Sequence, residues 1–547
     1  MSGRSRDRLD PVTFGVLSSA LVSVAEEMGA ALRASSYSPI IREMQDYSCA
    51  LLDADGRLVA QGEFIPAQLG AIASVIRSTL EAHRGSLAAG DVFIANHPYR
   101  GGAHTPDVNV IRPIFQPGGR SGRLLGWAGT VAHQVDFGGP NPGTEGADHR
   151  DLFAEGLILP PIRLETAAGP TADLYELVAA NVRDPVATLA DLRAQVAACR
   201  VGERRLLELL GVYGRSTIEA AFRDVIDHAE RRTRAALAAL PDGEAAAEAC
   251  LDDDGAGGPP ARIAVRLHKH GDRLTVDLSG SAGQVPGGLN VPWASTLASV
   301  AYLVRAVSDP TIPANEGTLA PVTIVCPEGS VFRPRPPAAV SVRHLTIQRL
   351  ADVMVQAAAT LWPERVPVAG HFVGFFSIMA VGPSPRDGRP VVLQDVVGGG
   401  TGAHAGGPGL DAVDTHLSNV GLLSAEVCET EYAWRLVRSE LLPGSGGRGR
   451  WPGGRGVRRT YEVLAARQPV VLYCEQTDSR WRPRGAAGGG DGAVTRLVVR
   501  DPAGRRRFAP RKGTITLEPG STVTIETGGG GGYGAPASAA PSRDVRR

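Results

Sequence analysis

Apolar residues recur at steps of three and four positions near the start of the chain, the spacing that places them on one face of a helix. Asp10 is a suitable N-cap and Pro11 suits the first helical turn. The pattern predicts a helix whose apolar stripe packs against a core. Its members are Phe14, Leu17, Leu21, Val24, Met28 and Leu32.

The rest of the chain alternates between helical and strand-like patterns. Short apolar runs predict strands at 47–52, 58–60, 92–95, 124–131 and 391–397, and a hairpin at 262–267 and 273–278. Longer periodic stretches predict helices at 69–80, 289–307 and 344–361, and two helices within 189–240 that are interrupted near 211–214. The fold class predicted is therefore α+β, a mixed α/β multi-domain chain with a helix-rich N-terminal part and a strand-rich C-terminal part.

The composition break Asp252–Pro260 is the predicted domain boundary. It separates an N-terminal domain at 1–251, which carries the candidate metal site and long helices, from a mixed α/β C-terminal domain at 261–534. Residues 252–260 are then a linker and 535–547 a disordered tail, because the tail is small and polar. The glycine-rich stretch 482–492 is predicted to be a flexible loop.

The amino-acid composition limits the classes of function that the chain could have. Of 547 residues, 43% are hydrophobic and 21% charged, and 57 basic residues balance 57 acidic ones, so nothing favours nucleic acid or an anionic membrane as a partner. The six cysteines are far apart and form no C-x-x-C pair. No secretory signal or run of apolar residues long enough for a membrane helix is recognisable. A cytoplasmic protein is expected.

Histidines and aspartates follow two of the predicted strands. His104 and Asp107 lie in the polar stretch after the strand at 92–95, and His133 and Asp136 come directly after the strand at 124–131. If the chain brings these segments together, imidazoles and carboxylates meet, a set that suits Zn²⁺, Mn²⁺, Fe²⁺ or Ni²⁺ without selecting among them. The residues alone leave open whether they bind a metal or serve as structural hydrogen-bonding groups.

Other motifs point away from common enzyme classes. There is no G-x-x-x-x-G-K-[ST] loop, so this chain is not expected to bind ATP in a Walker A loop. Gly398–Gly402 could cradle a phosphate, although a tight turn is the simpler interpretation. No G-x-S-x-G elbow occurs and no cysteine has a histidine nearby in sequence, which disfavours a serine or cysteine nucleophile.

Several stretches, in this order, resemble the hydantoinase B family from about Asp10 to about Pro536. The family includes B subunits of N-methylhydantoinase and caprolactamase, the C-terminal half of 5-oxoprolinase and a subunit of acetone and acetophenone carboxylases. The landmarks are Asp46–Ala50, Pro98–Gly102 with His104 and Asp107, Ala132–His133 with Asp136–Gly139, Glu155–Leu157, Pro160–Pro161, Asn315–Gly317, Arg333–Pro337, Gly398–Gly400 and Thr527–Gly534.

The resemblance implies a B-type subunit that works with an A-type ATPase in a hetero-oligomer. The partner binds ATP and phosphorylates a cyclic amide such as a hydantoin, 5-oxoproline or a lactam. The B subunit holds a divalent metal, whose bound water attacks the activated substrate. Carried onto this chain, the metal ligands are Asp46, His104, Asp107 and His133, and Asp136 is a catalytic base or an orienting group. Asp46 enters only through the resemblance.

The chain also departs from the family pattern. Phe64 and Gln68 stand where many relatives have histidine, Gln134 replaces the second residue of a frequent His-His pair, and Asn96-His97 replaces a more usual Asn/Asp-Asp. Two alternatives therefore stay open. One is a subunit of an ATP-dependent ketone carboxylase of the acetone or acetophenone type. The other is a non-catalytic assembly subunit whose metal site has decayed.

Overall fold

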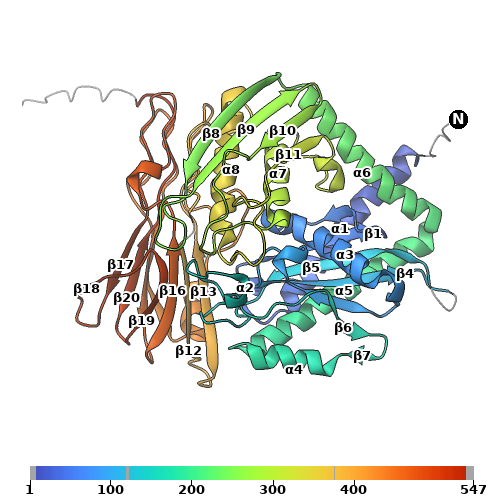
Figure 1. Ribbon diagram of the computed structural model, residues 1–547, viewed down its shortest axis with the longest axis horizontal. Coiled ribbons are helices and arrows are strands. Elements are labelled where there is room, and N and C mark those ends of the chain that lie inside the picture. The colour runs from blue at the N-terminus through green and yellow to red at the C-terminus, as the bar shows by residue number, and fades with distance from the viewer. Residues whose placement is uncertain (1–7, 119–121, 375, 537–547) are drawn as a thin grey trace, which may run out of the picture.

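The computed structural model describes residues 8–118, 122–374 and 376–536. Four sheets and their covering helices follow one another in space much as they do along the chain (Figure 1). These are an N-terminal sheet (blue to cyan), a small second sheet (green) and two C-terminal sheets (orange to red). The predicted α+β class is confirmed. The part of the predicted tail at 537–547 lies outside the described residues.

The N-terminal sheet has seven strands in the order β2-β1-β5-β4-β3-β6-β7, with every neighbouring pair antiparallel. The predicted strands at 47–52, 58–60, 92–95 and 124–131 are confirmed with small changes of length. Strand bounds are β1 Tyr47–Asp53, β2 Leu58–Gln61, β3 Val92–Ala95, β4 Asp107–Phe115, β5 Leu124–His133, β6 Ile162–Thr166 and β7 Gly169–Pro170.

Helices cover both faces of this sheet. α1 and α5 pack on one face, where Leu51, Val108 and Ala128 point, and α3 packs on the other, against Ile111 and Trp127. This division follows from the alternation of side chains along each strand. Helix bounds are α1 Pro11–Ser35, α2 Pro39–Arg42, α3 Leu69–His83, α4 Ala172–Asn181, α5 Pro185–Tyr213 and α6 Arg215–Ala238. The predicted interruption near 211–214 is the junction of α5 and α6.

Helix α1 begins as predicted. The Asp10 side chain accepts hydrogen bonds from the backbone amides of Val12 and Thr13. By length and composition, α1 is the one helix in the described part of the chain that could cross a membrane. However, Leu17, Leu21 and other members of its apolar stripe are buried against β1 and α5, as in a core helix of a globular domain.

The second sheet has four strands in the order β11-β10-β9-β8, and α8 packs on β8 and β9. The predicted hairpin is confirmed by antiparallel β9 and β10. Residues 252–260 connect β8 with β9, which are neighbours in this sheet, and the division of the chain into domains stays a prediction. Bounds are β8 Gly243–Cys250, β9 Arg262–His270, β10 Arg273–Asp277, β11 Val322–Val325, α7 Trp293–Val307 and α8 Arg343–Leu361.

The two C-terminal sheets pack face to face. Ile378 and Leu472 from one share a core with Tyr461 and Ile525 from the other. The opposite face of the first sheet carries Tyr473 toward α8. Strand orders are β13-β12-β16-β19 and β14-β15-β20-β17-β18. Bounds are β12 Phe376–Pro383, β13 Pro390–Val397, α9 Ala425–Glu431, β14 Trp434–Leu441, β15 Val457–Val463, β16 Gln468–Cys474, β17 Arg496–Arg500, β18 Arg506–Arg507, β19 Lys512–Leu517 and β20 Thr522–Glu526.

Glycine-rich segments at 398–402, 446–454, 485–492 and 528–534 pack against one another, and we call this assembly the glycine bundle. Their backbones exchange hydrogen bonds, for example from the Gly530 amide to Gly454 and from the Ala486 amide to Gly532, both at 2.9 Å. The prediction of a flexible loop at 482–492 therefore differs from the structure. Because glycine has no Cβ, these backbones approach closely enough to bond, and the same holds for Gly398–Gly402, which is bonded within the bundle.

Asp191, fully buried in α5, gives a stability prediction. One carboxylate oxygen accepts hydrogen bonds from the backbone amides of Tyr37 and Ser38, at 2.7 and 3.2 Å. Burial raises the pKa of Asp191 to about 6. The folded chain therefore holds this proton more tightly than the unfolded chain. The stabilisation that results is complete below about pH 4 and is lost as the pH rises to about 6.

Asp191→Asn removes this titration. As the pH rises from 4.5 to 7.5, the wild type loses this stabilisation and the variant does not. We therefore expect the free energy of unfolding of the variant, relative to that of wild type, to increase by up to about 3 kcal/mol between these two pH values. Denaturant unfolding of both proteins at both pH values measures the change. A difference in stability that stays constant with pH would contradict the assignment.

Candidate functional site

The ends of β4 and β5 position the central residues of the site. The two strands pair antiparallel, and the register places Asp107 directly opposite His133. His104 precedes β4 in the turn, where the Asp107 amide bonds to the His104 carbonyl at 3.1 Å. The predicted meeting of the two segments therefore takes place, and it brings His104, Asp107 and His133 together.

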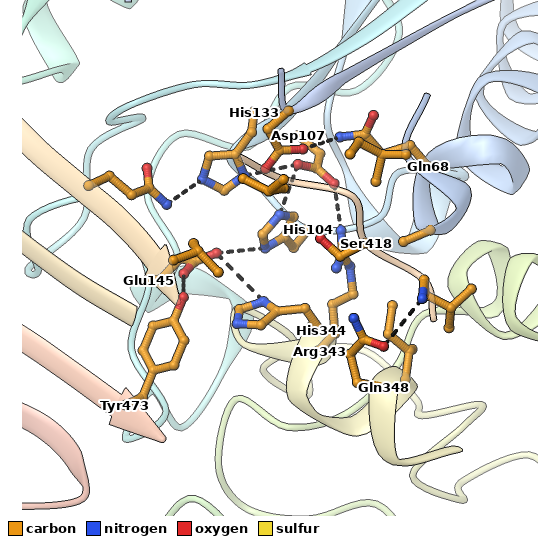
Figure 2. A pocket seen from close by; sticks show the side chains of 18 residues that line it. Gln68, His104, Asp107, His133, Glu145, Arg343, His344, Gln348, Ser418 and Tyr473 are labelled. Atoms are coloured by element: carbon orange, nitrogen blue, oxygen red, sulfur yellow. Dashed lines mark hydrogen bonds and ion pairs between the residues drawn. The ribbon is translucent and has the colours of Figure 1, made fainter. Parts of the chain in front are cut away.

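Asp107 lies at the centre of this cluster and contacts its other members (Figure 2). Its Oδ1 lies 2.9 Å from His104 Nε2 and 3.1 Å from His133 Nδ1, and its Oδ2 accepts a hydrogen bond from Arg343 Nη2 at 2.6 Å. The other ring nitrogen of His104 lies 2.8 Å from the Ser341 carbonyl oxygen, which fixes the ring. Two imidazoles thus converge on one carboxylate that a buried guanidinium holds in place.

Asp46 completes the predicted set. It lines the same cavity as the other three, next to the start of β1, and its Oδ1 accepts a hydrogen bond from Gln68 Nε2 at 2.8 Å. Its backbone carbonyl accepts from the His133 amide at 3.1 Å, so β1 and β5 are joined at this point. All four predicted ligands therefore face one cavity of about 50 Å³.

The structure adds residues that the sequence did not single out as site residues. Glu145 Oε1 lies 3.3 Å from His104 Nδ1, and the hydroxyl of Tyr473 donates to the other Glu145 oxygen. Gln394 on β13 lies 3.1 Å from His133 Nε2. Arg343 and His344 enter from the start of α8. These residues come from separate parts of the chain and share no local pattern with the His/Asp pairs, so no signal in the sequence marks them as one site.

In this cluster, burial and the neighbouring charges shift the pKa values of the side chains in opposite directions. Burial raises the pKa of Asp46 to about 6. Burial would also raise the pKa of Asp107, but His104 and Arg343 beside it hold that pKa well below its usual range. For His133, burial favours the neutral ring, yet the hydrogen bond with Asp107 and the carboxylates of Asp46 and Glu145 raise its pKa to about 9. The carboxylates of the cluster therefore favour the protonated ring of His133.

Asp136 does not line this cavity, and its role as a catalytic base or an orienting group stays a prediction. Its carboxylate is fully buried, pairs with Arg183 at 2.7 Å and accepts hydrogen bonds from the amides of Gly138 and Gly143. The chain turns at Gly138 and Gly139, both with positive φ, and this turn directs Asp136 toward Arg183. Asp136 thus fixes the loop after β5.

Phe64, Gln68 and Gln134, which depart from the family pattern, lie in different surroundings. Gln68 borders the cavity and bonds to Asp46, whereas the Phe64 ring packs 5.1 Å from the Tyr47 ring and does not line the cavity. Gln134 is buried away from the cavity and donates to Gln195. Of these three positions, only Gln68 lines the cavity.

Comparison with known proteins gives a consistent result. Residues 10–536 match the family described as hydantoinase B/oxoprolinase. The caprolactamase subunit beta of Pseudomonas jessenii is 31% identical over 96% of this chain and 91% of its own length. The 5-oxoprolinase 1 of Arabidopsis thaliana is 30% identical over 96% of this chain but only 42% of its own length.

Two solved structures share the fold. The ATP-dependent caprolactamase from Pseudomonas jessenii matches with a TM-score of 0.88 at 28% identity, covering 97% of this chain and 92% of the other. Acetone carboxylase in its nucleotide-free form also matches with a TM-score of 0.88, but at 18% identity and over 76% of its chain. The second likeness is one of fold alone.

Proposed function

Because the chain belongs to the hydantoinase B/oxoprolinase family, we propose that it is the B-type subunit of an ATP-dependent hydrolase that opens a cyclic amide. The proposal rests on one observation above all, the convergence of Asp46, His104, Asp107 and His133 on a single buried cavity. The relatives named above include a lactamase and an oxoprolinase, and both names refer to cyclic amides.

The donor set suits a divalent transition metal. Atoms of His104, Asp107 and His133 lie within 4.8 Å of one another, and Asp46 adds a second carboxylate. The Ser341 carbonyl accepts from His104 Nδ1, which leaves Nε2 as the ligand nitrogen, an arrangement that metal-binding histidines use widely. When bound, such a cation would act as a Lewis acid and increase the acidity of water.

Arg343 gives the cavity a group for an anionic substrate. It is the only arginine or lysine among the described residues that line the cavity, and Asp107 orients its guanidinium. Its Nε has no hydrogen-bond partner within the described residues. A guanidinium is well suited to phosphate oxygens, so Arg343 would bind a substrate that carries a phosphoryl group.

The source of that phosphoryl group would be a separate ATPase subunit. The sequence contains no Walker A loop, and the similar caprolactamase chain is named as a subunit. Amides resist attack by water, and phosphorylation of the amide oxygen makes the carbonyl carbon more electrophilic. Water then adds to this carbon, the ring C–N bond breaks as the nitrogen takes up a proton, and a second water hydrolyses the resulting acyl phosphate to the acid and phosphate. In this scheme the A-type partner binds ATP and activates the substrate, and the chain described here completes the reaction within a hetero-oligomer.

The test is reconstitution. We expect the purified chain by itself to hydrolyse no hydantoin, 5-oxoproline or lactam. With an A-type ATPase subunit, ATP and a divalent metal, we expect it to hydrolyse one of these cyclic amides. Ring opening and phosphate release are measured together. Rapid ATP-independent turnover by the isolated chain would contradict the proposal.

A second candidate is a subunit of an ATP-dependent ketone carboxylase, favoured by the fold shared with acetone carboxylase. The same reconstituted complex distinguishes the two. Activity that needs bicarbonate and consumes a ketone supports the carboxylase, whereas ring opening without bicarbonate supports the hydrolase.

A further inference from the structure

A second cluster of metal-ligating side chains lies outside the cavity described above. Asp352 projects from α8, His371 precedes β12, and His416 lies in the segment between β13 and α9. One ligand atom from each residue lies within 4.8 Å of the others. Their exposed fractions are 1%, 6% and 8%, so all three are more than nine-tenths buried.

The two imidazoles in this cluster each have a free nitrogen. Neither His371 Nδ1 nor His416 Nε2 has a hydrogen-bond partner among the residues that the structure describes. The His371 Nδ1 lies 3.9 Å from Asp352 Oδ1, which is too far for a hydrogen bond. The rings themselves are close, with centroids 4.6 Å apart. Buried nitrogens without a partner are uncommon and call for an explanation.

A hydrogen bond at one ring nitrogen of His416 determines which tautomer the ring adopts. Its Nδ1 lies 2.9 Å from the hydroxyl oxygen of Tyr302. If Nδ1 carries the proton and donates to that oxygen, Nε2 presents a lone pair. The opposite tautomer would bury an N–H donor with no acceptor, which costs more. The favoured tautomer is the one that a metal ligand needs, with its other nitrogen held by a hydrogen bond.

The carboxylate is also held in place. Asp352 Oδ2 accepts from Gln356 Nε2 at 2.6 Å and lies 3.5 Å from Arg349 Nη1. Its Oδ1 accepts from the backbone amide of His371 at 3.2 Å and faces the cluster. Burial lowers the pKa of both His371 and His416, so the rings are neutral at neutral pH, as ligands must be.

We propose that Asp352, His371 and His416 form a second metal site that binds a first-row divalent cation of the Zn²⁺ class. Two imidazoles and one carboxylate at one point form a ligand set of this class, and bonds of about 2.0–2.2 Å require only small movements of side chains that already lie this close. Water would occupy the remaining position. The site stands apart from the proposed hydrolytic centre and does not depend on it.

The position of this second site suggests a supporting role. His416 is followed by Leu417 and Ser418, which line the first cavity, and α8 carries Arg343 into that cavity nine residues before Asp352. At about 1.5 Å per residue, the two points on the helix are roughly 13 Å apart. A cation held between α8 and His416 would therefore fix one wall of the first cavity relative to the helix that supplies its arginine.

The experiment is metal stoichiometry on the full chain with its partner subunit. The complex is stripped with a chelator, reloaded with Zn²⁺ or Co²⁺ and desalted, and metal is measured by elemental analysis. We expect two equivalents per chain for wild type and one for His371→Gln and for His416→Gln. The matched control His404→Gln, an exposed histidine in the same segment, should keep both. His104→Gln should lose the other equivalent.

The outcomes separate the two sites. If His416→Gln loses one equivalent and His104→Gln loses none, the second site stands and the proposed hydrolytic centre fails. If wild type binds at most one equivalent and only His104→Gln removes it, the second site is refuted. Should a glutamine variant not fold, Co²⁺ titration of stripped wild type decides, because absorption that saturates at one equivalent also refutes the site.

Discussion

Asp107→Asn should lower the ATP-dependent activity of the complex at least about 100-fold, because even groups that only orient metal ligands contribute 10–100-fold. Asp107 does more than orient. Its two oxygens contact His104, His133 and Arg343, and the low pKa of its carboxyl keeps it charged. Asparagine retains the size but removes the charge. We also expect the metal equivalent that depends on His104 to be lost.

Asp136→Asn is the matched control for this prediction. Both aspartates are buried and both pair with an arginine, but Asp136 pairs with Arg183 outside the cavity. The control should lose stability, because the Arg183 guanidinium loses its partner, while metal content stays within the wild-type range. Full metal loss in Asp136→Asn, with Asp107→Asn still active and folded, would reverse the roles assigned to the two residues.

The different outcomes for Asp107 and Asp136 show what the sequence could predict about the site. Short apolar strands at 92–95 and 124–131 are each followed by a His/Asp pair, and neighbouring strands would bring the two pairs together. In the structure β4, which the sequence did not predict, lies between β3 and β5, and it is the register of β4 with β5 that places Asp107 opposite His133. The pattern could not show that the backbone turns at Gly138, which takes Asp136 to Arg183. Spacing predicts where a strand ends more reliably than where the next side chain points.

The cavity wall shows a second limit of sequence reasoning. Arg343 belongs to a helix whose existence the periodicity of 344–361 predicted, yet its contact with Asp107 spans 236 positions. Nothing local to Arg343 or Glu145 marks them, because the contacts depend on how the second sheet and α8 pack against the N-terminal sheet. The helices and strands follow from local patterns, whereas the complete site requires the tertiary packing.

The prediction of a flexible loop at 482–492, a segment of the glycine bundle, was wrong for a different physical reason. A run of glycines in a short sequence window indicates conformational freedom, since each residue can adopt many backbone angles. Four such runs in one chain can instead satisfy one another's backbone hydrogen bonds, as the amides of Gly530 and Gly532 do with the carbonyls of Gly454 and Gly490. The absence of side chains, which suggested flexibility, is what permits the close packing.

Gly530→Ala should therefore destabilise the protein by about 3 kcal/mol or more, at the upper end for an overpacked interior. A Cβ on Gly530 would overlap the carbonyl group of Thr401 and press on the amide of Gly402, and these are backbone atoms that cannot rotate away. The amide of Gly530 also bonds to Gly454, so a shift of one segment disrupts its neighbours. Thermal and denaturant unfolding measure the loss.

Gly15→Ala makes the same chemical change where there is space. Gly15 is exposed within α1, and a Cβ there meets nothing within 4 Å. Alanine favours helix over glycine, so this variant should gain up to about 1 kcal/mol. Opposite signs for the two substitutions would establish that the bundle is a packed structure. Equal and small effects would instead mean that the segments separate readily.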